Sequence, residues 1–161
     1  MSRGSTLVEV LTAAAIMAGI TLIVVLVHSQ GLRVQKSQAA DQEAYRSAML
    51  AVRSLRQELR GAILLEPADL TGVPVQRLAY RPMMPDAGPS WADAVEVVLT
   101  EDGWLQRVDS EGGARGLVYL GEESSVSFRR AAARVLEVTI VSTREGAVYE
   151  ARHSLALVNQ P

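Results

Sequence analysis

The feature that most restricts this chain of 161 residues is an apolar run near its N-terminus, from Leu7 to Val27. The run reads LVEVLTAAAIMAGITLIVVLV and contains one charged residue, Glu9. About 20 consecutive apolar residues are enough for a helix to cross the hydrocarbon core of a bilayer. Arg3 precedes the run, and the next Lys or Arg is Arg33. Because basic flanks stay in the cytoplasm, we expect one membrane span with its N-terminus inside and the bulk of the chain outside.

Three interpretations of this run compete. A secretory signal peptide has a shorter apolar region, about 7–15 residues, followed by a cleavage site of small residues. The residues Val27-His28-Ser29-Gln30 make a poor site of that kind. A plain signal anchor that holds an outer domain fits the hydropathy but leaves Glu9 unexplained. In the third interpretation, a peptidase cuts on the N-terminal side of the apolar run.

The residues before the run favour the third interpretation. Met1-Ser2-Arg3-Gly4 is a short basic leader that ends in glycine, and Ser5-Thr6-Leu7-Val8-Glu9 follows it. This arrangement resembles the N-terminal cleavage and methylation motif of type IV pilins and type II secretion pseudopilins. The resemblance implies that a prepilin peptidase cuts between Gly4 and Ser5, that Ser5 is N-methylated, and that Glu9 becomes the fifth residue of the mature chain. Ser5 stands where the family usually has Phe or Met.

Glu9 has two interpretations of its own. A carboxylate near the cytoplasmic end of the run can reach the membrane interface, which lowers the energetic cost of placing it there. The resemblance implies instead that Glu9 of an incoming subunit pairs with the new amino group of Ser5 on a neighbour. Opposite charges attract strongly in a low dielectric, so this pair would set the axial register between subunits.

Beyond the run, the sequence predicts that the same helix continues. No proline lies between His28 and Arg60, and apolar residues recur there at spacings of three and four. The expected apolar stripe is Tyr45, Ala48, Met49, Val52, Leu55 and Leu59. We therefore predict one helix from Thr6 to Arg60, roughly 80 Å long at about 1.5 Å per residue, with Gly61 as its stop.

Beyond residue 91 the apolar residues alternate with a period of two, which indicates half-buried antiparallel strands. Hairpin turns are expected at 101–103, 112–113 and 144–146, and an exposed loop at 81–91. The expected strands are 76–81, 94–100, 104–109, 117–120, 125–129, 134–142 and 147–158. The predicted architecture is an α+β fold in which the long N-terminal helix packs on an antiparallel β-sheet. Its parts are a leader (1–4), a transmembrane half-helix (5–27), an amphipathic half-helix (28–60) and a β-rich domain (61–161).

The later segments narrow the resemblance. The segments 55–60 (LRQELR), 78–81 (LAYR), 103–107 (GWLQR) and 155–159 (LALVN) are similar to those of W-type minor pilins and J-type minor pseudopilins of type II secretion. The resemblance implies an inner-membrane subunit with its C-terminal domain outside, assembled into or at the tip of a pilus or pseudopilus. The implied partners are other pilins through the N-terminal helix, the prepilin peptidase, membrane lipid and an assembly platform. The alternatives are a major repeating pilin and a signal-anchored binding domain that never polymerises.

Composition argues against other classes of function. The formal net charge is -2, which is unlike the basic excess of nucleic-acid-binding proteins, so no direct nucleic-acid partner is expected. The chain has no cysteine, and its two histidines, His28 and His153, lack the spacing of a metal motif. The acidic doublets at 101–102 and 122–123 fall at turns, without the dense oxygen ligands of a calcium loop. We expect no enzyme, no cofactor and no metal site.

Overall fold

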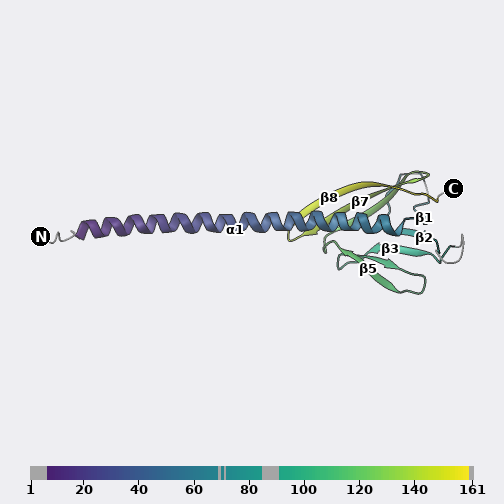
Figure 1. The fold of residues 1–161 in the computed structure, drawn as a ribbon, viewed down its shortest axis with the longest axis horizontal. Coiled ribbons are helices and arrows are strands. Elements are labelled where there is room, and N and C mark those ends of the chain that lie inside the picture. The colour runs from purple at the N-terminus through teal and green to yellow at the C-terminus, as the bar shows by residue number, and fades with distance from the viewer. Residues whose placement is uncertain (1–6, 69, 71, 85–90, 160–161) are drawn as a thin grey trace. The chain divides into compact units, whose positions relative to one another are not determined.

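The computed structural model describes residues 7–68, 70, 72–84 and 91–159 of the chain. By their internal contacts the residues fall into two compact units, one up to Ala39 and one from Ala40 onward. The predicted α+β fold is confirmed: one long N-terminal helix is followed only by antiparallel strands in the described part of the chain (Figure 1).

Helix α1 runs from Leu7 to Glu58. In the first unit, every helical residue from Leu7 to Ala39 is exposed within the molecule. This part of the helix is long and apolar enough to cross a membrane. The predicted start, Thr6, lies outside the described residues. The helix ends two residues before the predicted Arg60, in a tighter turn that Gly61 closes with a φ of 80°.

The strands of the second unit form two antiparallel sheets rather than the single sheet that the sequence predicts. Sheet A has the order β1 (Ile63–Glu66), β2 (Leu78–Arg81), β3 (Val95–Leu99), β4 (Trp104–Val108) and β5 (Ala114–Tyr119). Sheet B has the order β6 (Ser125–Ala132), β7 (Val135–Arg144) and β8 (Ala147–Ala156). The three predicted hairpin turns are confirmed, whereas β1 is not among the expected strands. Part of the expected loop at 81–91 lies outside the described residues.

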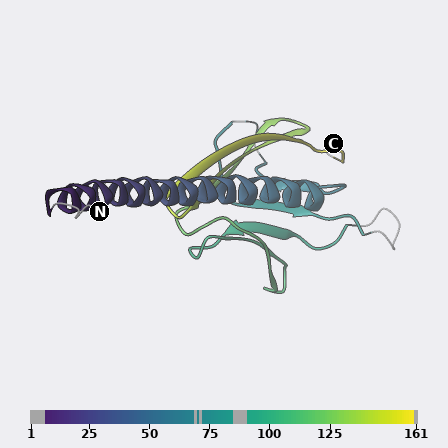
Figure 2. The same cartoon turned by 60° about the vertical axis from the view of Figure 1, so that its left-hand side comes forward.

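A single hydrophobic core joins the second half of α1 to both sheets. The two views show one sheet on each side of this part of the helix (Figures 1 and 2). Alternate residues of β7 are buried, among them Leu136, Val138 and Ile140, as the period of two predicts. Each sheet therefore turns one face toward the helix and the other toward solvent.

The buried face of α1 is built from smaller side chains than the sequence suggests. Tyr45, expected in the apolar stripe, is 51% exposed, although its ring meets the Tyr149 ring edge-on at 5.1 Å. Small residues take the centre of the buried face, which lets the helix backbone approach the sheets closely. The buried residues of the helix are Ala40, Ala44, Ser47, Ala48, Ala51, Val52 and Leu55. Burial thus begins at Ala40, the first residue of the second unit.

Candidate functional site

Of the predicted N-terminal site residues, the structure describes the register carboxylate but not the processing site. Gly4 and Ser5 lie outside the described residues. Glu9 lies in the first turn of α1 and is exposed within the molecule. A negative charge in this turn interacts favourably with the positive end of the helix dipole, which supports the helix start.

The other polar side chains of the apolar segment satisfy their own hydrogen bonds. The Thr12 hydroxyl donates to the carbonyl oxygens of Val8 and Glu9 at 3.0 Å, and the Thr21 hydroxyl donates to that of Met17 at 2.8 Å. A hydroxyl bonded to its own helix can enter an apolar medium without an orphaned donor. Glu9 is the one ionisable side chain between Leu7 and Val27.

A polar cluster anchors the C-terminal end of α1 to sheet A. Glu58, the last helical residue, accepts a hydrogen bond from the Tyr80 hydroxyl at 2.7 Å and pairs with the Arg107 guanidinium at 3.4 Å. Tyr80 is fully buried, and burial, followed by the hydrogen bond to Glu58, raises the pKa of its hydroxyl far above the usual value. The phenol stays neutral at physiological pH, so this cluster holds the helix in place rather than supplying a nucleophile.

We call the second unit, from Ala40 onward, the head. Near the start of the head, a second cluster joins the helix to both sheets. Arg144 of β7 pairs with Glu43 of α1 at 2.9 Å, and its guanidinium lies 4.5 Å from the centre of the Tyr119 ring of β5. Tyr119 in turn contacts Trp104 of β4, with 5.2 Å between the ring centres. Trp104 is thus held by packing, although 43% of it remains exposed. These contacts fix the positions of α1, β4, β5 and β7 relative to one another.

Three turns meet beside this cluster. The Leu120 amide donates to the Gly103 carbonyl at 2.8 Å, and the Thr143 amide donates to the Ser124 hydroxyl at 3.0 Å. Gly121 follows Leu120 with a φ of 112°, and its backbone passes directly against that of Thr143. The chain changes from sheet A to sheet B at this point.

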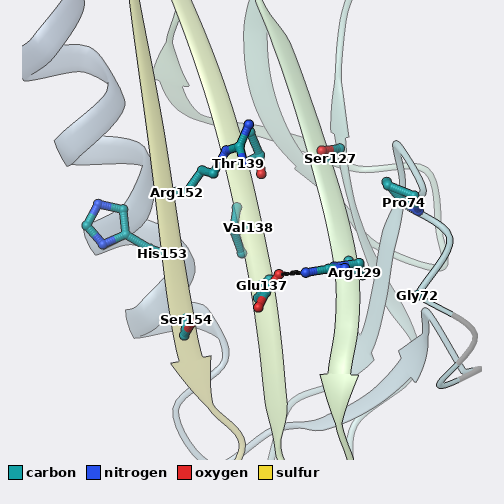
Figure 3. Close-up of a pocket in the computed structure, with 10 residues that line it drawn as sticks. All are labelled: Gly72, Pro74, Ser127, Arg129, Glu137, Val138, Thr139, Arg152, His153 and Ser154. Atoms are coloured by element: carbon teal, nitrogen blue, oxygen red, sulfur yellow. Dashed lines mark hydrogen bonds and ion pairs between the residues drawn. The ribbon is translucent and has the colours of Figure 1, made fainter.

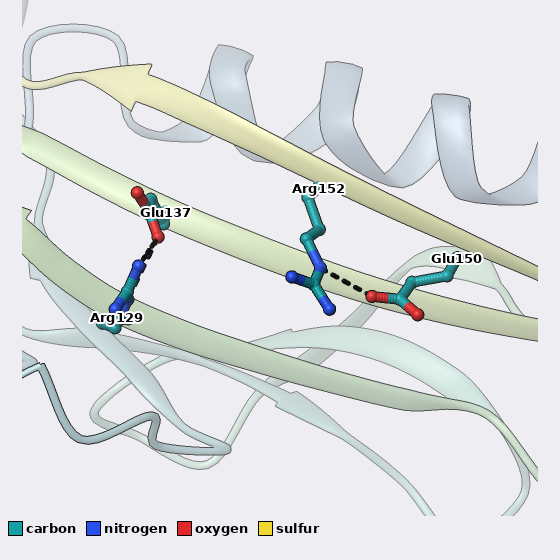
Figure 4. Close-up of polar contacts among 4 residues, drawn as sticks. All are labelled: Arg129, Glu137, Glu150 and Arg152. Carbon is teal, nitrogen blue, oxygen red and sulfur yellow. Dashed lines mark hydrogen bonds and ion pairs between the residues drawn. The ribbon is translucent and has the colours of Figure 1, made fainter.

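The outer face of sheet B carries a shallow groove with a volume of about 610 Å³. Its walls are the 72–74 segment and the solvent-facing residues of β6, β7 and β8 (Figure 3). Arg129 is engaged by Glu137, and Arg152 by Glu150 at 2.7 Å, so both guanidinium groups near the groove already have acidic partners (Figure 4). The lining residues are Gly72, Pro74, Ser127, Arg129, Glu137, Val138, Thr139, Arg152, His153 and Ser154. This chemistry is that of a solvated sheet face with one ion pair across β6 and β7 and one within β8.

The remaining sequence candidates do not assemble into a reactive site. The His153 side chain points away from the groove, toward α1, and His28 lies on the exposed first part of the helix (Figure 3). Within the described ranges, no three His, Asp or Glu side chains gather closely enough to hold a metal ion. Glu101, Asp102, Glu122 and Glu123 do lie at turns, as predicted.

Sequence reasoning missed both polar clusters. Glu58 and Tyr80 are 22 residues apart, and Glu43 and Arg144 are 101 apart, so no local pattern links the partners. The sequence offered one weak signal for the first cluster, which is that Glu58 lies next to the apolar face near the end of the helix. Comparison of the chain with protein-family models, curated proteins and solved structures found no significant match.

Proposed function

We propose that this protein is a minor pilin or pseudopilin, a subunit anchored in the inner membrane by α1 and assembled into, or at the tip of, a type IV pilus or a type II secretion pseudopilus. The observation that carries this proposal is the character of α1. It is one uninterrupted helix that is apolar and wholly exposed at its start and one-sided where it packs on the β-sheets.

The exposed apolar surface of the helix requires a non-aqueous environment. The large apolar side chains from Leu7 to Val27, including Ile16, Ile20 and Ile23, are more than half exposed within the molecule. Each large apolar side chain left in water forgoes about 1.5–3 kcal/mol of burial free energy. Lipid and a bundle of parallel helices both remove this surface from water, and a helix suits both because its backbone hydrogen bonds are internal.

The N-terminal motif selects a filament subunit over a plain anchor. Cleavage after Gly4 by a prepilin peptidase leaves Ser5 with a free or N-methylated amino group. Glu9 then supplies the opposite charge for a neighbour's Ser5, which offsets the penalty of a carboxylate in the apolar segment. The leader is cytoplasmic before cleavage and the β-rich head lies outside the inner membrane. The partners are other pilin-like subunits and an assembly platform.

The first experiment is intact-mass measurement of the full chain expressed with and without a prepilin peptidase. We expect loss of Met1 to Gly4 only when the peptidase is present and Gly4 is intact, so Gly4→Ala blocks the cut. Gly19→Ala is the matched control, because it is the same substitution within α1, at a glycine with open space around it. An uncut chain, or a cut beyond Val27, would refute the proposal and leave an anchored or secreted binding domain.

The second experiment tests Glu9 after cleavage. We expect Glu9→Gln to leave processing intact but to reduce incorporation into sheared filaments, because it removes the charge that pairs with Ser5. Thr12→Val is the control, since the Thr12 hydroxyl bonds only to its own helix backbone. Abundance of the wild-type chain in purified filaments separates a minor subunit from a major one. Equal incorporation of Glu9→Gln and wild type would contradict the assigned role.

A further inference from the structure

The solvent-facing side of α1 within the head is a basic surface that no described residue neutralises. Arg46 and Arg53 are seven residues apart, about 10 Å along α1, and so lie in one line opposite the buried face, and Arg60 follows in the turn that ends the helix. Arg56 flanks this line. All four side chains are exposed, and none of them forms an ion pair with any residue that the structure describes. We call these four residues the basic helix face.

The same head carries a complementary acidic surface on its turns. The β3–β4 turn holds Glu101 and Asp102, the β5–β6 connection holds Glu122 and Glu123, and the β7–β8 turn holds Glu145. All five carboxylates are exposed, and among the described ion pairs none involves them. We call them the acidic turns.

The acidic turns form one surface because their backbones are locked together. The amide of Leu120, just before the β5–β6 connection, donates to the Gly103 carbonyl at 2.8 Å, and the Thr143 hydroxyl donates to the Glu123 carbonyl at 3.3 Å. The ion pair between Arg144 and Glu43 places this surface beside the part of α1 that precedes the basic helix face. The two charged surfaces therefore sit at different levels along the same helix.

We propose that the basic helix face of one subunit docks onto the acidic turns of a second copy of this chain. Two copies in parallel orientation, displaced along α1 by about 5–25 Å, bring the turns of one alongside Arg46 to Arg60 of the other. Four unpaired guanidinium groups then meet five unpaired carboxylates, an arrangement that favours association and fixes its register. The contact joins two different surfaces, so it leaves one of them open on each partner for a further pilin-like subunit. The parallel orientation rests on the proposed function; the charge complementarity does not.

Disulfide trapping tests the contact, because the chain has no cysteine of its own. Full-length Arg53→Cys and Asp102→Cys chains are mixed in detergent micelles and in liposomes and then oxidised. We expect a mixed disulfide dimer whose yield falls at high salt, because screening weakens exposed charge pairs. The control replaces Asp102→Cys with Ser154→Cys, on the outer face of sheet B. Equal yields from the two pairs would overturn the proposal.

Charge reversal supplies the second test. Arg46→Glu, Arg53→Glu and Arg60→Glu together should lower self-association at least about tenfold, measured by analytical ultracentrifugation in micelles. Glu101→Arg, Asp102→Arg and Glu122→Arg in the partner chain should restore it. The same change in net charge at Arg115, Arg134 and Arg152 should have little effect. Failure of restoration overturns the docking, whereas an uncut Gly4 overturns only the proposed function, so the two failures are distinguishable.

Discussion

The replacement Gly121→Ala tests most directly how the two sheets are joined. Gly121 has a φ of 112°, a backbone conformation that residues with a Cβ adopt only under strain. A Cβ at this position would lie 1.8 Å from the Thr143 carbonyl oxygen, which is backbone and cannot rotate aside. The β5–β6 connection or the end of β7 would have to move by more than 1 Å, on the order of the overlap itself.

The magnitude follows from adding the two effects. Left-handed backbone strain is about 1–2 kcal/mol, and forced displacement of packed backbone adds about 1–3 kcal/mol. Gly112→Ala is the matched control, because Gly112 also has a positive φ, 84°, but meets nothing within 4 Å. We expect Tm to fall by roughly 10–20 °C for Gly121→Ala and by about 5 °C for Gly112→Ala.

Thermal unfolding of the full chain in detergent micelles measures both variants. Near-ultraviolet circular dichroism follows the head because Trp104 packs against Tyr119 next to the affected turn. Equal Tm losses for the two variants would show that backbone strain alone matters, and would refute the close approach of Gly121 to Thr143.

Three further outcomes follow from the packing of the head. Tyr80→Phe removes the hydrogen bond to Glu58 and should lower the free energy of unfolding by about 1–2 kcal/mol at pH 7, measured by urea unfolding. The pKa of Tyr80 is raised in the folded state, so the wild type should lose stability above about pH 10, where the unfolded phenol ionises, and Tyr80→Phe should lose less over that range. Arg144→Gln removes the ion pair with Glu43 and should lower stability by about 0.5–1 kcal/mol, an effect that shrinks in high salt. Leu55→Ala empties a fully buried position and should lower stability by about 2–5 kcal/mol in the same urea assay; a loss below 1 kcal/mol would contradict its place in the core.

Local periodicity was enough to predict the helix and most of the strands. The absence of proline from His28 to Arg60 and the alternation of Leu136, Val138 and Ile140 each reflect a geometry that repeats along one element. The turns were predictable from local residue types, since Gly103 and Gly146 provide the positive φ that their hairpins need. The acidic doublets at 101–102 and 122–123 were also visible in the sequence.

Features that depend on distant residues were not predictable. The division into two sheets depends on which strands pair with the chain after β5. The close contact of Gly121 involves Thr143, which comes more than twenty residues later in the sequence. The helix face was misjudged at Tyr45 because apolar size suggested burial, whereas close helix packing selects small residues such as Ala44 and Ala51. The Glu58–Tyr80–Arg107 cluster needs three elements to meet before it exists.

The two proposed subunit contacts make a joint demand on axial register. Pairing of Glu9 with a neighbour's Ser5 displaces parallel helices by four residues, or about 6 Å. In the head, the proposed docking needs a neighbour's acidic turns, which the ion pair between Arg144 and Glu43 holds beside α1, to lie alongside Arg46 to Arg60. Both contacts must be satisfied in the same pair of subunits. Arg46→Glu should therefore weaken the pairing of Glu9 with a neighbour's Ser5. When Arg46→Glu and Glu9→Gln are combined, the loss of filament incorporation should be smaller than the sum of the two separate losses.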